Sequence, residues 1–136
     1  MSLIISVDHG YGYIKTTNTA MITGIVPFDS EPFTMQNTLE YEGKYYVCGT
    51  SRQALTLDKT ANDNYYLLTL AAIAKEMTHK HYPHNQAEII LAAGLPLTRF
   101  GLEKESFKTY LGRLPQPIRF KYERQPYEIF VRDVLL

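Results

Sequence analysis

The N-terminal part of the chain is predicted to consist of short strands. Its first apolar run, Leu3 to Val7, has the length and the β-branched content of a strand. The polar, glycine-containing stretch from Asp8 to Gly12 follows, where such a strand would turn, and Tyr13 to Thr17 is predicted to be extended again. Between Thr19 and Thr38, glycine and proline interrupt short apolar runs, which favours strands joined by loops.

Two further segments have the alternation of β-hairpins. Polar and apolar residues alternate from Leu39 to Gly49 around Glu42-Gly43, where glycine can supply the positive φ of a tight turn. Near the end of the chain, Ile118 to Tyr122 and Tyr127 to Val131 alternate on either side of the polar residues Glu123 to Pro126. We therefore predict a hairpin in each segment.

The spacing of apolar residues also predicts two amphipathic helices. In the first, residues three and four apart form one stripe, which contains Tyr66, Leu67, Leu70, Ala71, Ala74 and Met77. Thr60 with Asp63, or Asn62 alone, can cap this helix, and Pro83 is expected to end it. The second helix is predicted within Thr98 to Gly112, with acidic residues early and basic residues late.

A buried strand is predicted between the two helices. Ala87 to Ala93 is a nearly continuous apolar run of strand length, as expected for a strand buried on both faces of a parallel or mixed sheet. Strands, helix, buried strand, helix and strands together indicate an α/β fold, in which helices cover a mixed β-sheet. The final residues, Asp133 to Leu136, are largely apolar, so we expect the sequence to stop inside a larger fold.

Composition narrows the possible functions. The chain has 136 residues, with 14 Lys and Arg against 14 Asp and Glu, which favours one domain over residues 1–136 and argues against a polyanion-binding protein. Cys48 is the single cysteine, so no intrachain disulfide can form, and a cytoplasmic location is expected. The apolar run before Asp8 is too short for a signal or membrane-spanning segment, so no membrane role is expected.

The stretch with the clearest chemistry is DHGYGYIK, from Asp8 to Lys15. Glycines at the tip of a strand–turn–strand expose backbone amides that suit phosphate oxygens. Lys15 adds a mobile positive charge, and Asp8, at the strand end, can hold a hydrated magnesium ion. These parts predict a nucleotide site. The alternative is that the glycines form an ordinary hairpin turn and that Lys15 is a solvated charge.

This stretch resembles the first phosphate loop of the actin, sugar-kinase and heat-shock-chaperone ATPase superfamily. With Tyr11 between the glycines, it looks like the loop of the ParM-type actin-like proteins that segregate plasmids. Three other stretches support this resemblance: the hairpin Tyr41 to Gly49, the helix start at residues 58–63, and Ala93 to Leu97 with the helix after it. The implied fold is the N-terminal domain of an actin-like ATPase, with a ribonuclease H-like mixed sheet.

The resemblance implies a role for each residue of the loop. Asp8 would lie near the water shell of the magnesium ion, Gly10 and Gly12 would lend amides to the β- and γ-phosphates, and Lys15 would contact phosphate oxygens. Tyr11 replaces the serine of conventional actin, and its phenol is too large to repeat the contact of that hydroxyl with the γ-phosphate.

The resemblance further implies a filament-forming protein. The full-length protein would bind ATP or GTP with magnesium, polymerise with copies of itself, and move plasmid DNA through an adaptor protein, without direct contact with nucleic acid. The second phosphate loop, the adenosine-binding segment and the residue that positions the attacking water have no counterpart up to Leu136. Phosphoryl transfer needs both walls of the cleft, so this chain alone is expected to be inactive.

Other functions stay open at this point. A small-molecule kinase of the same superfamily would use a similar loop, and a stand-alone interaction module could keep the fold without using it. His79, His81 and His84 could suggest a metal site, but they straddle a predicted helix end, where polar residues are the simpler interpretation. Cys48 lies on an apolar strand and is expected to be a buried, unreactive thiol.

Overall fold

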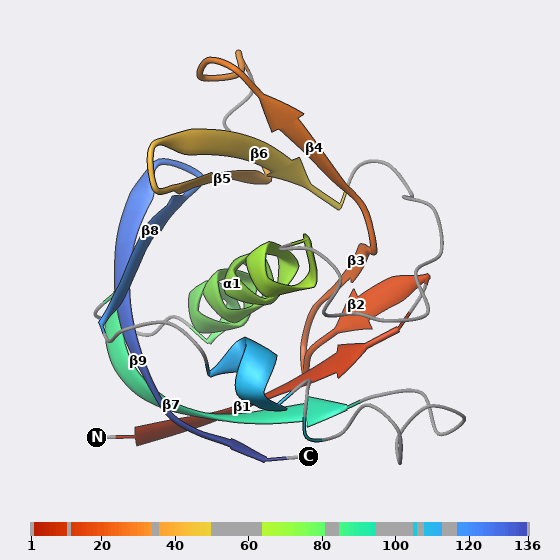
Figure 1. Cartoon of the computed structure of the whole chain (residues 1–136), viewed down its shortest axis with the longest axis vertical. Coiled ribbons are helices and arrows are strands. Elements are labelled where there is room, and N and C mark those ends of the chain that lie inside the picture. Colours follow the sequence, from red (N-terminus) through yellow and green to blue (C-terminus); the bar gives the residue numbers. More distant parts are fainter. Residues whose placement is uncertain are drawn as a thin grey trace.

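The computed structural model of the chain describes residues 2–10, 12–33, 36–49, 64–80, 85–94, 105, 108–112 and 117–135. These residues form a nine-stranded sheet that curls around a long helix, α1 (Figure 1). In chain order the elements are β1 (Ser2–His9), β2 (Tyr13–Lys15), β3 (Ala20–Ile22), β4 (Ile25–Phe28), β5 (Thr38–Tyr41), β6 (Lys44–Cys48), α1 (Asn64–His79), β7 (Gln86–Gly94), β8 (Ile118–Tyr122) and β9 (Gln125–Leu135).

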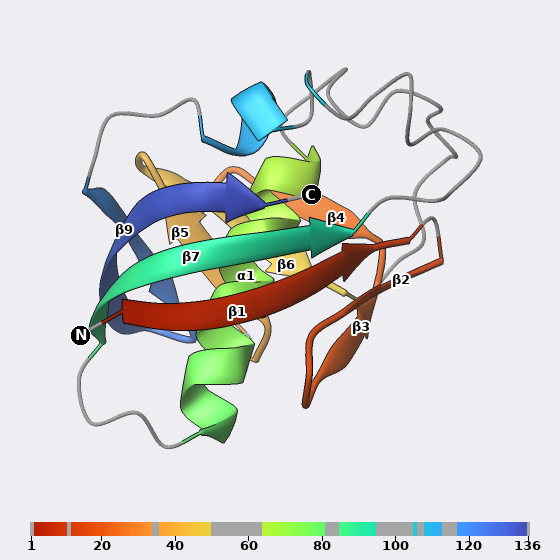
Figure 2. The ribbon, with the colours of Figure 1, turned by 90° about the horizontal axis from the view of Figure 1, so that it is seen from below.

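The sheet is mixed, as the sequence predicts. Its strand order is β3-β2-β1-β7-β9-β8-β5-β6-β4. The three central strands β1, β7 and β9 are parallel and lie side by side in Figure 2, whereas every other pairing is antiparallel. The pairing of the parallel strands β1 and β7 therefore ends at Asp8 and Gly94, on one edge of the fold.

The first predicted helix is confirmed as α1, but it is buried around most of its circumference and not along one stripe only. The predicted stripe is buried, but so are residues on the other faces, namely Tyr65, Leu68, Thr69, Ala72, Ile73 and Glu76. The reason is the curvature of the sheet, which surrounds the helix instead of covering one face of it (Figure 1). A helix that is apolar all round is typical of this enclosed position.

Strand β7 differs from its prediction as well. It is parallel to both of its neighbours, but it is not buried on both faces, because inward residues such as Ile89 and Leu91 alternate with more exposed ones such as Glu88. The inward residues belong to the same hydrophobic core as α1. On the outer face of the sheet, β1 and β9 leave large apolar side chains exposed: Ile4 is 64% exposed, Phe130 45% and Leu135 48%.

Both predicted hairpins are confirmed. In the first, Glu42 and Gly43 have φ values of 51° and 77°, so the glycine occupies a left-handed position, as expected. In the second, the turn is shorter than predicted and consists of Glu123 and Arg124, both with positive φ. Strand β9 continues to Leu135, beyond the predicted end at Val131.

Several sequence predictions fall outside the described residues, including the caps Thr60, Asn62 and Asp63, the helix stop Pro83, and most of the second helix. Residues 108–112 of that helix are joined to α1, because the Tyr66 amide donates to the Tyr110 hydroxyl at 2.8 Å. Among the helices that the structure describes, none has the length and apolar content needed to cross a membrane.

Candidate functional site

Asp8 and Lys15 lie directly opposite each other where β1 turns into β2. They form a register pair of the antiparallel ladder, and both side chains are exposed, so they share the outer face of the sheet. Asp8 is also the last residue of β1 that pairs with the parallel strand β7. The carboxyl edge of parallel strands is where α/β folds commonly bind ligands. The structure thus brings together the acidic and the basic residue that the sequence singled out.

The inner face beneath this pair is rigidly packed. His9 belongs to β1 and is fully buried, although the sequence suggested that the turn already begins at Asp8. Its Nε2 lies 2.8 Å from the Thr69 hydroxyl oxygen, and that hydroxyl donates to the Tyr65 carbonyl at 2.6 Å. Because the Thr69 proton is used in that bond, the His9 Nε2–H is the donor to Thr69. This contact ties the end of β1 to the middle of α1.

Gly10 permits the tight passage from β1 to β2. Its amide donates to the Tyr13 carbonyl at 3.1 Å, and a Cβ at this position would lie 2.6 Å from the same oxygen. A larger residue would therefore force the turn open. The amide is engaged in the turn, so donating it to a phosphate, as the family resemblance implies, would require this bond to open. Tyr11 lies outside the described residues.

Gly94 borders the site from the other side, and sequence reasoning did not identify it. It is the register partner of Asp8 on β7, and a Cβ at Gly94 would lie 3.3 Å from Asp8 Oδ1. Glycine thus leaves room for the Asp8 carboxylate beside the strand end. In the sequence, Gly94 stands out only because it ends an apolar run, and this position does not indicate that it lies beside Asp8.

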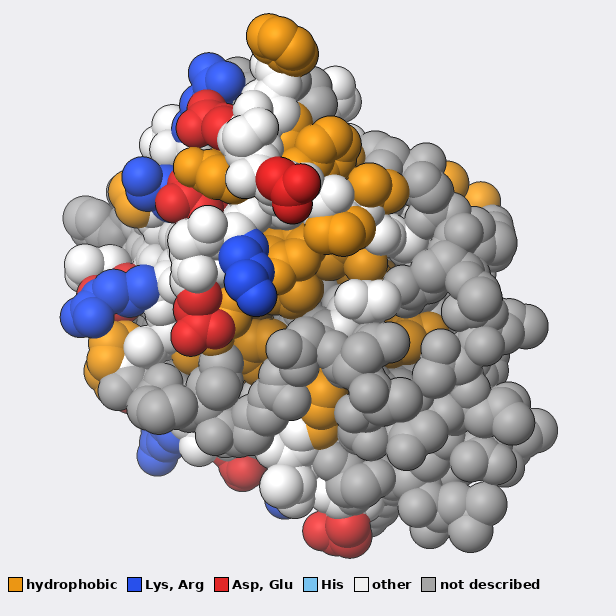
Figure 3. Space-filling model, turned by 45° about the horizontal axis from the view of Figure 1, so that its top comes forward, with side chains coloured by type: hydrophobic (Ala, Val, Ile, Leu, Met, Phe, Trp, Pro, Cys, Tyr) orange, Lys and Arg blue, Asp and Glu red, His pale blue; other side chains and the backbone are white. Residues whose placement is uncertain are grey.

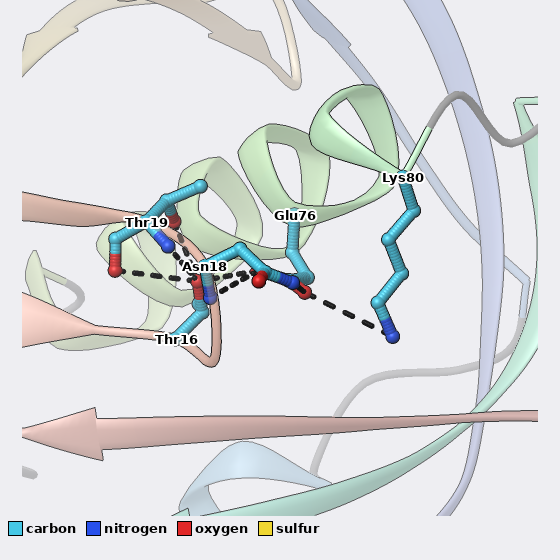
Figure 4. A network of polar contacts seen from close by, with 5 residues as sticks. All are labelled: Thr16, Asn18, Thr19, Glu76 and Lys80. Atoms are coloured by element: carbon cyan, nitrogen blue, oxygen red, sulfur yellow. Dashed lines mark hydrogen bonds and ion pairs between the residues drawn. The ribbon is translucent and has the colours of Figure 1, made fainter.

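The turn that follows Lys15 is held by a buried carboxylate. Glu76, on α1, is 1% exposed and accepts hydrogen bonds from the Thr16 hydroxyl at 2.7 Å and from the Asn18 amide and side chain at 3.1 and 2.7 Å (Figure 4). Burial alone would raise the pKa of Glu76, but these hydrogen bonds and the nearby charge of Lys80 outweigh it, so the pKa lies below its ordinary value. An ionised Glu76 therefore anchors the β2–β3 turn to α1.

Other candidate chemistry has little support in the described residues. His79 is the last residue of α1, while His81 and His84 lie outside the described part, within which no group of three metal-binding side chains occurs. Cys48 is 1% exposed, and burial raises its pKa to about 12 despite the opposing effect of Lys75, which confirms the prediction of a buried thiol.

The face that carries β4, β5 and β6 has a mixed character (Figure 3). Hydrophobic side chains gather there between acidic and basic ones, and a hollow of about 320 Å³ is lined by Tyr41, Tyr46, Tyr66 and Leu67, with Glu42 and Lys44. Arg124 pairs with Glu31 at 3.2 Å on the neighbouring loop. Such interspersed charges differ from the continuous basic surface that binds a phosphate backbone.

Comparison with solved structures identifies the same fold in filament proteins. The apo pSK41 ParM protein matches with a TM-score of 0.71 and 16% identity over 98% of this chain and 48% of that chain. An AlfA filament bound to AMPPNP matches with a TM-score of 0.69 and 14% identity over 99% of this chain and 54% of that chain. A 15-stranded ParM filament from Clostridium botulinum matches with a TM-score of 0.69 and 17% identity over 98% of this chain and 44% of that chain.

The chain spans about half the length of these solved structures, between 44% and 54% in the three cases. No curated protein sequence matches it. Residues 6–136 do match a family model, described as the N-terminal domain of actin-like proteins. That model covers β1 from Ser6, both glycines of the turn and the remaining strands. The chain therefore belongs to the actin-like proteins, in which it corresponds to the N-terminal domain.

Proposed function

We propose that the chain is the nucleotide-binding N-terminal half of an actin-like, filament-forming ATPase of the plasmid-segregation type. The observation that carries this proposal is the pair of Asp8 and Lys15, which face each other across β1 and β2 beside the glycine turn. An acidic and a basic side chain at the carboxyl edge of parallel strands are suited to a magnesium ion and its nucleotide phosphates.

The residues present fit such a ligand. Asp8 is exposed, and Gly94 beside it has no side chain that would cover the carboxylate. Asp8 would hold the magnesium ion through its water shell, and Lys15, also exposed, would contact phosphate oxygens. Gly10, Tyr11 and Gly12 would complete the loop around ATP or GTP. When bound, the metal ion neutralises phosphate charge, while these residues position the nucleotide.

Filament formation is the second part of the proposal. One similar structure is a ParM filament, and another is an AlfA filament bound to AMPPNP. The partners of the whole protein would accordingly be further copies of itself, and an adaptor protein would connect the filament to plasmid DNA. Because the chain spans about half of these structures, we expect it to hydrolyse nucleotide negligibly by itself.

Titration of magnesium-ATP into this chain, followed by calorimetry and by NMR of the Gly10 and Gly12 amides, tests the nucleotide site. We expect weak, saturable binding without measurable phosphate release in the same samples. Asp8→Ala and Lys15→Ala should each weaken binding about tenfold or more, because each removes a charged contact worth roughly 1.5–3 kcal/mol.

Asp29→Ala and Lys44→Ala serve as matched controls, since both residues are exposed and lie outside the loop. They should bind nucleotide as the unmodified chain does. If the unmodified chain does not respond to millimolar nucleotide, the nucleotide site is refuted and the interaction-module alternative gains support. Magnesium-dependent hydrolysis that Lys15→Ala abolishes would contradict the expectation that the isolated chain is inactive.

A further inference from the structure

Thr23 lies next to the glycine turn, although the two are apart in the sequence. It follows β3 directly, and it is 1% exposed. Its hydroxyl donates to the Gly10 carbonyl at 3.0 Å, and its backbone amide donates to the Gly12 carbonyl, also at 3.0 Å. One residue therefore holds the carbonyls of both glycines.

These two contacts restrict the conformation of the turn. A peptide group is planar, so holding the Gly10 and Gly12 carbonyls fixes the peptide plane that follows each glycine and restricts the ψ angle of each glycine. Glycine has few conformational restrictions of its own, and a loop with two glycines would otherwise sample many backbone states. Thr23 therefore restricts the conformation of a turn that its two glycines alone would not restrict.

Thr23 is itself held in place. The Gly24 amide donates to the Ile22 carbonyl at 2.8 Å, which makes a tight turn around Thr23, and the Gly49 amide donates to the Gly24 carbonyl at 2.7 Å. Gly49 has a φ of 80°, and a Cβ there would lie 3.0 Å from Met21 Cβ. The end of β6 thus fixes the residue that orders the glycine turn.

We propose that Thr23 is a positioning residue of the nucleotide loop, because its hydroxyl and its amide hold the backbone of the glycine turn in place. This inference rests on the nucleotide site proposed above. The ordering of the turn is present in the chain without a ligand, so it can be measured separately from nucleotide binding.

A matched pair of variants isolates the hydroxyl. Thr23→Ser and Thr23→Ala both lose the methyl group, but only Thr23→Ala loses the donor to Gly10. In magnesium-ATP titrations we expect Thr23→Ala to raise the Kd about three- to tenfold, the effect of one hydrogen bond, and Thr23→Ser to stay within about twofold of the unmodified chain. Equal affinity of the two variants would overturn the proposal.

Amide hydrogen exchange of Gly10 supplies the readout that does not need nucleotide. Exchange in Thr23→Ala should be about three- to tenfold faster than in Thr23→Ser, because the turn loses one hydrogen bond. If the unmodified chain binds no nucleotide, the proposed function fails, and this comparison still decides the role of Thr23: faster exchange supports it and equal exchange refutes it.

Folding is checked by circular dichroism in each case. Thr23→Val keeps the volume and shape of the buried side chain and replaces Thr23→Ala if the smaller residue prevents folding, with the same expected results. Thr17→Ala is the control, because Thr17 is an exposed threonine in the β2–β3 turn. Its affinity and its Gly10 exchange should match those of the unmodified chain, and a change equal to that of Thr23→Ala would contradict a specific role for Thr23.

Discussion

At the scale of single residues, burial controls the pKa of the Cys48 thiol and therefore its reactivity. The side chain is 1% exposed in β6, and burial raises its pKa to about 12, with a smaller opposing effect from Lys75. Only the thiolate is nucleophilic, so near neutral pH the folded protein contains very little of the reactive form.

Labelling with a thiol reagent such as Ellman's reagent tests this description. We expect Cys48 to react on the native chain at pH 8 at least about a hundredfold more slowly than in denaturant, because reaction requires the strand to open. The reaction should reach one equivalent in urea, which serves as the control. Rapid stoichiometric labelling without denaturant would show that the thiol is accessible.

The candidate site was predictable from the sequence only in its local part. Asp8 and Lys15 belong to one short stretch, so their spacing alone indicates that they meet across a turn. Thr23, directly after β3, and Gly94, on β7, lie against that stretch, and single-sequence patterns carry no information on such contacts. The sequence indicates that Gly10 is a turn residue, but it does not indicate that the Gly10 amide donates to the Tyr13 carbonyl.

At the scale of elements, one buried carboxylate of α1 joins the helix to the β2–β3 turn. Glu76 accepts three hydrogen bonds from Thr16 and Asn18, and Lys80 lies 3.9 Å away (Figure 4). The pKa of Glu76 is lower in the folded protein than its ordinary value of 4.5. Its contribution to stability is therefore complete above that value and is lost as the pH falls below it.

Replacing Glu76 by glutamine should consequently destabilise the chain in a pH-dependent way. At pH 7 we expect a loss of about 1–3 kcal/mol in the free energy of unfolding, because hydrogen bonds to a charged acceptor are lost or weakened. The difference from the unmodified chain should shrink as the pH falls below the ordinary value of 4.5, because the stabilising charge of the native carboxylate is progressively lost there. Urea unfolding at pH 7, 5 and 3 measures both effects.

Glu105→Gln is the control for this prediction, since Glu105 is exposed. Its stability should follow the unmodified chain at each pH to within about 0.5 kcal/mol. A difference between Glu76→Gln and the unmodified chain that stays constant from pH 7 to pH 3 would show that the charge of Glu76 does not contribute.

Most elements were predictable because their patterns are local, whereas their burial was not. The hairpin at Glu42 and Gly43 and the apolar run of β7 are visible in the sequence. The enclosure of α1 and the half-open outer face of β7 depend on how strongly the whole sheet curves, which no single segment encodes. Apolar residues at Tyr65, Leu68 and Ile73 were the available sign that the helix is buried beyond one stripe.

At the scale of the whole molecule, the outer face of the sheet exposes large apolar side chains on two strands. Ile4 and Phe130 are 64% and 45% exposed on β1 and β9, the two strands that flank β7. Exposed apolar side chains favour contacts with other apolar surfaces.

We therefore expect the folded chain to bind the dye ANS. The double variant Ile4→Thr, Phe130→Thr should lose most of this fluorescence while its free energy of unfolding changes by less than about 1 kcal/mol, because threonine suits a strand and both residues are exposed. Phe33→Ser is the control: Phe33 is exposed but lies outside the central strands, so its replacement should leave the fluorescence unchanged. Full fluorescence in the double variant would assign the dye to another surface.

The strand order also has a consequence for the time at which the molecule can fold. Ser2 pairs with Glu88, and Gln86 pairs in turn with Glu128, so β1 finds its parallel neighbour β7 only after β2 to β6 and α1 have been made. Until then α1 has no completed wall around it. The centre of the sheet is consequently assembled late. If synthesis stalls before β9 has been made, the apolar side chains of α1 stay exposed.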